Sequence, residues 1–142
     1  MTKVGELIPR LLSEFPEFQE RWDEHVRHWK GESAGSYNDL AEFVHFVVED
    51  LYEKGKIERT RHVFAVVERM LNEGDADIVE LISLGFFETL QNVASWPPGG
   101  AAAFKPLLGV VSTEVWAELD QLWAGKSSLM DVIRSEKERE KT

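Results

Sequence analysis

The pentapeptide Gly31–Gly35, GESAG, matches the G-x-S-x-G pattern that surrounds the nucleophilic serine of serine esterases. That chemistry requires a strand leading into a strained turn, so that the serine hydroxyl is exposed beside backbone amide donors. The residues before Gly31 instead have the apolar spacing of an amphipathic helix, and the β-branched runs of a hydrolase sheet are absent. We therefore interpret Gly31–Gly35 as a loop between helices in which Ser33 is not a nucleophile.

Histidines and glutamates at helical spacing are a second pattern with chemical potential, in this case for metal binding. His25 and His28 are three residues apart, and Glu42 with His45 reads E-x-x-H. Di-iron bundles use two E-x-x-H helices together with two further inward-facing glutamates, whereas this chain contains one such motif. The basic neighbours of His28 would repel a cation. We expect no metal ligands, no cofactor, and structural or surface roles for these histidines.

Neighbouring carboxylates, such as Asp75 with Asp77 and Glu49 with Asp50, are a third pattern, one that acid–base catalysis uses. Catalytic pairs of glycosidases lie at set separations in a deep cleft, which a small helical domain seldom offers. Helix capping and solvation explain these residues more simply. The chain also has no cysteine and no Gly-rich phosphate loop ending in Lys-Ser or Lys-Thr. Because no nucleophile, base and oxyanion donor converge, we expect a protein that is not an enzyme.

The composition fits one globular domain that binds protein rather than nucleic acid or membrane. With 142 residues, 43% of them hydrophobic and 30% charged, the chain is long enough to bury a core without disulfides. Its net charge of −10 repels phosphate backbones and anionic lipid, and it favours encounter with basic partners. The sequence shows neither a secretory signal nor an apolar run of about 18 residues, so we expect a cytoplasmic protein.

Helices must position all of these residues, because apolar positions recur at helical spacing and strand alternation is absent. We predict an all-α fold, a compact bundle of about six to seven helices in one domain over residues 1–126. The predicted helices span about 7–15, 16–30, 36–54, 57–72, 76–93 and 112–123, with a short turn over 104–108. The residue types expected of N-caps occur at Ser36, Asp75 or Asp77, and Ser112 or Thr113. Residues 127–142 are predicted to be a charged C-terminal helix or a frayed tail.

The fourth and fifth predicted helices form a helix–turn–helix unit that is typical of an α-solenoid. The turn Gly74–Val79 resembles the turn between the paired helices of HEAT-like repeats. One such antiparallel pair is clear in the chain, and Glu80 stands where the repeat usually has a basic residue. The sequence therefore predicts a single HEAT-like pair rather than a repeat array.

The fifth helix lies in a segment of uncompensated negative charge. From Asn72 to Phe104 there is no lysine or arginine. The acidic residues of the segment are Glu73, Asp75, Asp77, Glu80 and Glu88. At about 3.6 residues per turn, one side of the helix carries Glu80, Leu84, Phe87, Glu88 and Gln91. If that side is exposed, it offers apolar anchors flanked by carboxylates to a basic protein partner; if it is covered, Leu84 and Phe87 pack beneath another helix.

Two further segments are candidates for partner binding. Tyr37, Asn38 and Asp39 stand at the start of the predicted third helix. Trp96 flanks a Pro-Pro-Gly-Gly break that predicts a surface loop. An exposed tryptophan beside an acidic helix is typical of an interface anchor, and the alternative is that Trp96 folds back as a lid over the core.

Three runs of residues resemble the sequences of a bacterial family of small, acidic, all-α proteins of uncharacterised function. They are Tyr37-Asn38-Asp39-Leu40-x-x-Phe43-x-x-Phe46-Val47-Val48, Val66-x-Glu68-x-x-Leu71-x-Glu73-Gly74-Asp75 and Gly85-Phe86-x-Glu88-x-Leu90-Gln91-Asn92. The resemblance covers about Phe15 to Trp123 and implies no catalytic activity. Such proteins look like the immunity proteins encoded beside bacterial toxins, which bind and neutralise a cognate toxin.

These observations favour a non-catalytic, acidic protein-binding module. Our first hypothesis is an immunity protein that binds and neutralises a cognate bacterial toxin domain. A nuclease toxin would suit this inhibitor, because a nuclease needs a basic groove for phosphates and an acidic surface is complementary to that groove. The alternative is a HEAT-like scaffold or adaptor with no toxin partner. The sequence leaves the partner's identity and the oligomeric state open.

Overall fold

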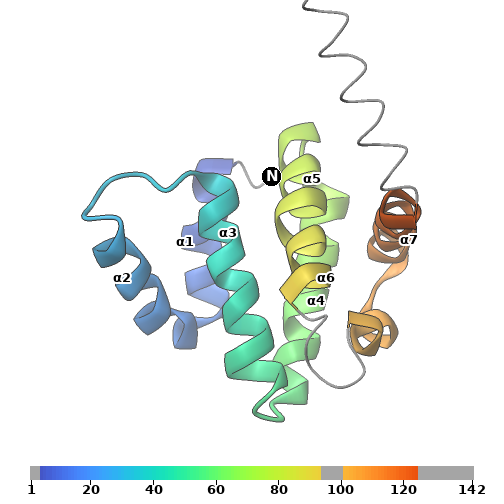
Figure 1. Cartoon of the computed structure of the whole chain (residues 1–142), viewed down its shortest axis with the longest axis horizontal. Coiled ribbons are helices and arrows are strands. Elements are labelled where there is room, and N and C mark those ends of the chain that lie inside the picture. The colour runs from blue at the N-terminus through green and yellow to red at the C-terminus, as the bar shows by residue number, and fades with distance from the viewer. Residues whose placement is uncertain (1–3, 94–100, 125–142) are drawn as a thin grey trace, which may run out of the picture.

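The computed structural model describes residues 4–93 and 101–124, and within them every regular element is a helix (Figure 1). The predicted all-α fold is therefore confirmed. The elements are η1 (Val4–Glu6), α1 (Leu7–Glu14), η2 (Pro16–Phe18), α2 (Gln19–His28), α3 (Ser36–His45), η3 (Phe46–Tyr52), α4 (Ile57–Glu73), α5 (Ala76–Leu81), η4 (Ile82–Glu88), α6 (Thr89–Val93), η5 (Ala101–Leu107) and α7 (Val110–Ala124). Trp96, the loop that contains it and the tail 127–142 lie outside the described residues.

Two of the predicted helices contain a wider π-helical stretch. The helix expected over 36–54 is α3 continued by the π-helix η3, and the helix expected over 76–93 is α5, the π-helix η4 and α6 in succession. A π-helix closes i→i+5 hydrogen bonds and holds more residues per turn than an α-helix. Within each stretch the side chains are therefore rotated relative to the positions that an α-helical wheel assigns.

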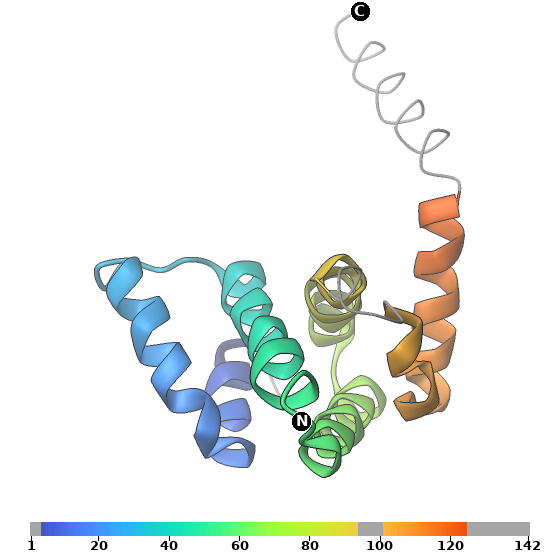
Figure 2. The ribbon, with the colours of Figure 1, turned by 60° about the horizontal axis from the view of Figure 1, so that its bottom comes forward.

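The helices form two layers, with α3 at the centre of one of them (Figure 2). In that layer α3 lies between α2 on one side and the continuous α5–η4–α6 on the other, and it contacts both. The other layer contains α1 and α4. α4 contacts η3 and α5, and α7 packs against α4 and η4. α4 and α5 are antiparallel and are joined by a tight turn at Gly74, as the sequence predicted for the HEAT-like pair (Figure 1).

Phenylalanine side chains form the centre of the core and connect the two layers. Eight of them are almost fully buried: Phe15, Phe18, Phe43, Phe46, Phe64, Phe86, Phe87 and Phe104. The ring centroid of Phe86 lies 6.3 Å from that of Phe43 on α3 and 5.9 Å from that of Phe64 on α4. Each such ring removes a large apolar area from water, and tilted or edge-on contacts between rings add further attraction. These contacts fix which side of each helix remains outward.

α3 and η4 approach closely at Gly85. A Cβ atom at this position would lie 3.1 Å from Cδ2 of Leu40 and 3.4 Å from Cδ1 of Tyr37. A side chain here would press against α3, so the absence of one allows the two helices to pack at short range.

The described helices include none that is long and apolar enough to cross a lipid bilayer.

A carboxylate from α4 caps the N-terminus of α7. The helix begins at Val110. The sequence predicted that Ser112 or Thr113 would cap it, and this prediction is wrong. Instead Glu68 accepts hydrogen bonds from the amides of Val111 (2.7 Å) and Ser112 (3.1 Å) and from the Ser112 hydroxyl (2.8 Å). Gly109 leaves room for this carboxylate, which a Cβ atom would contact. By contrast, Asp75 caps α5 as predicted, accepting from the amide of Ile78.

The ionised form of Glu68 is favoured by this arrangement. Burial of the carboxylate opposes ionisation, but the hydrogen bonds from Ser112 and Val111 outweigh burial and hold the pKa of Glu68 below its ordinary value. A lowered folded-state pKa means that the stabilisation is fully present above the unfolded-state pKa of about 4.3 and is lost as the pH falls through the folded-state pKa.

The substitution Glu68→Gln tests this cap. We expect the free energy of unfolding near pH 7 to fall by about 1 to 2 kcal/mol, because the variant loses a charged acceptor at a helix N-terminus. The deficit should shrink as the pH is lowered below about 4.3, where wild-type Glu68 also becomes neutral. Urea denaturation followed by circular dichroism measures both values. The matched control is Glu73→Gln, since Glu73 is an exposed carboxylate at the end of the same helix; equal losses in the two variants would contradict the assignment.

Candidate functional site

The outer side of α5 and η4 is defined by residues spaced four apart. Glu80 is exposed, Leu84 is 38% exposed and Glu88 is half-buried. Residues four apart on a helix lie on the same side, so the three form one stripe with an apolar residue between two carboxylates. Of the five residues that the sequence placed on this side, these three remain together. We call them the outer stripe.

Phe87 does not belong to the outer stripe, which corrects the sequence-based assignment. Its side chain is 0% exposed, and its ring packs edge-on to Phe86 (5.1 Å between centroids) and to Trp116 of α7 (6.4 Å). An α-helical wheel places residues 80 and 87 together, because seven residues make about two turns. The π-helical turns of η4 hold more residues each, so Phe87 is rotated toward the core. Phe87 is therefore a packing residue and not an exposed anchor.

Gln91 also points away from the outer stripe. Its Nε2 donates to Oδ1 of Asp120 on α7 at 3.3 Å, and its Oε1 is buried without a hydrogen-bond partner in the described part of the chain. Gln91 and Asp120 line a hollow of about 260 Å³ between α6, η5 and α7. The residue thus belongs to the contact between α6 and α7.

The carboxylates of α5 and its flanking residues have no ion-pair partner in the part of the chain that the structure describes. Among residues 4–93 and 101–124, no lysine, arginine or histidine lies within ion-pair distance of Glu73, Asp77, Glu80 or Glu88. Glu73, Asp77 and Glu80 are exposed, and Asp75 is engaged as the cap of α5. Unpaired carboxylates with no nearby cation produce a negative potential at this end of α5.

The residues at the start of α3 face different neighbours. Tyr37 is 49% exposed and its ring approaches Gly85 of η4. Asn38 is exposed and donates from Nδ2 to the carbonyl oxygen of Ala34 at 2.8 Å. Asp39 is half-buried and pairs with His25 of α2 (2.9 Å). Tyr37 therefore borders the outer stripe, whereas Asp39 faces the opposite helix.

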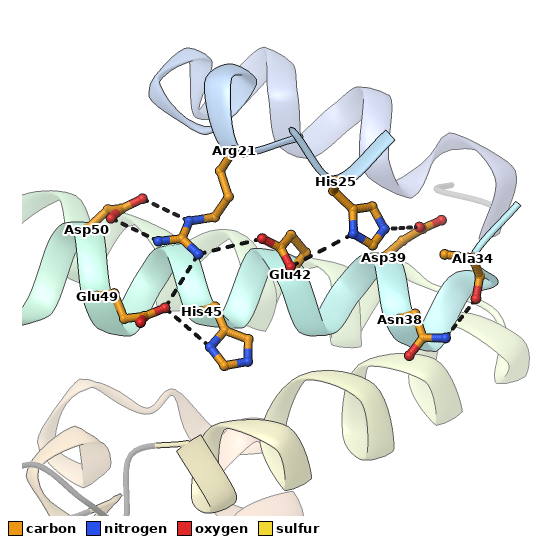
Figure 3. A network of polar contacts seen from close by, with 9 residues as sticks. All are labelled: Arg21, His25, Ala34, Asn38, Asp39, Glu42, His45, Glu49 and Asp50. Atoms are coloured by element: carbon orange, nitrogen blue, oxygen red, sulfur yellow. Dashed lines mark hydrogen bonds and ion pairs between the residues drawn. The ribbon is translucent and has the colours of Figure 1, made fainter. Parts of the chain in front are cut away.

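A polar network lies in the contact between α2 and α3 (Figure 3). Its centre is Arg21, which no sequence pattern singled out. The guanidinium of Arg21 donates two hydrogen bonds to Asp50 (3.0 and 3.1 Å) and lies 3.5 Å from Glu42 and 3.4 Å from Glu49. Burial lowers the pKa of Arg21, but the hydrogen bond to Asp50 and the other negative charges outweigh burial and raise it above its ordinary value. Arg21 thus contacts three carboxylates in a row along α3 and η3 and reduces their mutual repulsion.

Two of the three histidines considered as metal ligands, His25 and His45, are part of this network. His25 faces Asp39 through Nε2 and lies 3.8 Å from Glu42 through Nδ1, while His45 contacts Glu49 (3.2 Å) (Figure 3). In the described part of the chain, no group of three or more histidine, cysteine or acidic side chains is arranged to hold a metal ion. The network can stabilise the α2–α3 contact.

The loop with the G-x-S-x-G pattern follows α2, a helix and not a strand, and Ser33 Oγ accepts a hydrogen bond from the amide of Gly35.

A second hollow, of about 420 Å³, lies where α2 meets the end of η3. Its charged walls carry residues of both signs. They are Glu17, Glu20, Arg21, Glu24, Asp50, Lys54 and Lys56. Arg21 and Asp50 bond to each other, and Glu17 bonds to Arg59 at 2.7 Å. The other four charged side chains, Glu20, Glu24, Lys54 and Lys56, are two of each sign, so the hollow does not favour one sign of ligand.

Comparison with known proteins identifies one relationship. The model of a protein family described as a domain of unknown function, DUF7674, matches residues 8–124. No curated protein and no solved structure matches the chain.

Paired substitutions test the orientation of the outer stripe. We expect Phe87→Ala to lower the free energy of unfolding by about 3 to 5 kcal/mol, because it leaves a cavity between η4 and α7. Leu84→Ala should change it by no more than about 0.5 kcal/mol, as at most surface positions. Urea denaturation of both variants gives the comparison. Similar losses in the two would mean that the outer stripe is covered.

Arg21→Met tests the α2–α3 network. The variant leaves Glu42, Glu49 and Asp50 without their shared cation, and we expect a loss of about 2 kcal/mol, below that of a fully buried pair because Arg21 is partly solvated. Adding sodium chloride should reduce the deficit by screening the repulsion between the carboxylates. The control is Arg27→Met on the same helix, where the arginine is exposed. A loss no larger than that of the control would show that the network adds little.

Proposed function

Because the chain belongs to the DUF7674 family, a domain of unknown function, we propose its function from the geometry of its surface: it is a non-catalytic protein-binding module that docks a basic protein. The observation that carries the proposal is a group of exposed carboxylates, Glu73, Asp77 and Glu80, that have no ion-pair partner among the described residues; exposed Leu84 follows Glu80 by four residues. On α3 and η3, by contrast, Glu42, Glu49 and Asp50 share Arg21, and Asp39 contacts His25, so the carboxylates near the start of α5 are the ones left for the cations of a partner.

The partner that suits such a surface best is a bacterial toxin domain with a basic active-site groove, which makes this protein an immunity protein. A nuclease holds phosphates with lysines and arginines, and an acidic inhibitor placed over that groove gains complementary charge and a fast association rate. The core of closely packed rings supports this role, because a rigid surface loses little conformational entropy on binding.

A second candidate function is a scaffold or adaptor without a toxin partner. The antiparallel pair α4–α5 and the two-layer arrangement favour it, since HEAT-like proteins present one layer of helices to their partners (Figure 2). The two functions predict different gene neighbours. An immunity gene lies beside the gene of its toxin, whereas a scaffold gene has no such requirement.

The first experiment mixes the purified protein with the toxin domain encoded by the adjacent gene. We expect a stable complex, loss of the toxin's activity, and an association rate that falls steeply as sodium chloride is added. The double variant Glu80→Lys/Glu88→Lys should slow association at low salt by about tenfold and leave dissociation less affected. Stopped-flow fluorescence or surface plasmon resonance measures both rates.

The matched control is Glu114→Lys/Glu118→Lys, which makes the same change in charge at two exposed positions four apart on α7. This control should keep most of the association rate. Equal slowing in both double variants would mean that net charge, and not the outer stripe, governs encounter. If the adjacent gene product forms no complex, the immunity function is contradicted.

A further inference from the structure

The exposed apolar residues of this protein are few, and two of them border the same seam. Large apolar side chains that are well exposed in the described residues are Val26, Trp29, Tyr37, Ile57, Leu84 and Val110. Tyr37, at 49% exposure, lies on α3, and Leu84, at 38%, lies on η4. The ring of Tyr37 reaches Gly85, the residue after Leu84, so both border the line where α3 packs on η4.

Gly85 is the reason that this apolar surface exists. A Cβ atom there would press on Leu40 and meet the ring of Tyr37 at 3.4 Å. Without it, the Tyr37 ring, the buried Leu40 and the buried Leu81 all approach the η4 backbone at Gly85. The exposed apolar atoms of Tyr37 and Leu84 therefore lie next to well-packed core residues, so a partner side chain would bind to a rigid surface.

The charged residues that flank Leu84 along its helix have one sign. Glu80 precedes Leu84 by four residues and Glu88 follows it by four, and no lysine or arginine occurs between residues 72 and 104. Neither carboxylate has an ion-pair partner among the described residues. The exposed Val26 and Trp29 on α2 differ in this respect, because Arg27, Lys30, Glu24 and Glu32 surround them with mixed charge.

We propose that Tyr37 and Leu84 are the apolar anchor point of the docking surface, and that the surface takes a protein segment in which an apolar side chain is flanked by lysines or arginines. This inference rests on the proposed function and specifies the partner's chemistry. The apolar contact supplies most of the residence time, and the pairing of basic residues with Glu80 and Glu88 sets the register and the association rate. An apolar segment with acidic flanks, nucleic acid and anionic lipid are all disfavoured by the same carboxylates.

Two synthetic peptides test the anchor without requiring the natural partner. In the first, a Trp-Leu pair is flanked on both sides by lysines; in the second, two serines replace the pair and the charge is unchanged. Titration of the isotope-labelled full-length protein, followed by NMR, gives the affinity and the residues affected. We expect the first peptide to bind about tenfold more tightly than the second and to shift the amides of Tyr37, Leu84 and Gly85.

Variants of the protein separate the anchor from the charge. Tyr37→Ala/Leu84→Ala should remove the difference between the two peptides while leaving the weaker, salt-sensitive binding that both share. Val110→Ala, which shortens the most exposed apolar side chain on α7, should change neither affinity. Urea denaturation checks that each variant is as stable as the wild type.

Each other outcome would contradict the proposal that Tyr37 and Leu84 are the apolar anchor point. Equal binding of the two peptides would mean that charge alone governs docking, and binding of neither would mean that the seam holds no such segment. Shifts confined to the hollow near Lys54 would place the contact elsewhere, and shifts at the seam that grow with protein concentration alone would identify a second copy as the occupant. None of these results bears on complex formation with the product of the adjacent gene, which tests the proposed function separately.

Discussion

The stack of aromatic rings between the two layers is the contact on which the rest of the structure depends. Phe86 touches Phe43 of α3 and Phe64 of α4, and Phe87 beside it touches Trp116 of α7. Three helices, α3, α4 and α7, are therefore held by one short stretch of η4. Because this stretch turns Phe86 and Phe87 inward together, Leu84 and Glu88 are left on the outside. The same packing that stabilises the core thus determines what a partner can contact.

Negative charge is used in two ways in this fold. Along α3 and η3, carboxylates are paired with Arg21, His25 and His45 and join α2 to the rest of the protein (Figure 3). At the start of α5 the carboxylates have no such partners in the described residues. Paired charges of this kind contribute to structure, whereas unpaired ones shape the surface potential. The contrast distinguishes the proposed docking surface from the side of α3, where the carboxylates contact Arg21 or a histidine of the protein itself.

The local features of the fold could be predicted from the sequence, and the long-range contacts could not. Apolar spacing gave the helices, and the residue type of Asp75 gave the cap of α5, because both depend on neighbours within a few residues. Glu68 caps a helix that starts more than forty residues later, and Arg21 meets Asp50 across a helix contact, so no local pattern encodes either. Phe87 was misplaced since an α-helical period does not reveal a π-helical turn. The sequence left open whether Leu84 and Glu80 are exposed or covered; both are exposed in the structure, and their role in binding stays a prediction.

If the outer stripe and Tyr37 contact a basic protein, the amides near them should be protected in the complex. Hydrogen–deuterium exchange of the chain, free and bound to the toxin domain encoded beside it, measures this protection. We expect slower exchange on binding over residues 36–38 and 73–92, with no change around the hollow at Lys54 and Lys56 or on the exposed side of α7. Protection confined to that hollow or to α7, with residues 73–92 unaffected, would contradict this contact.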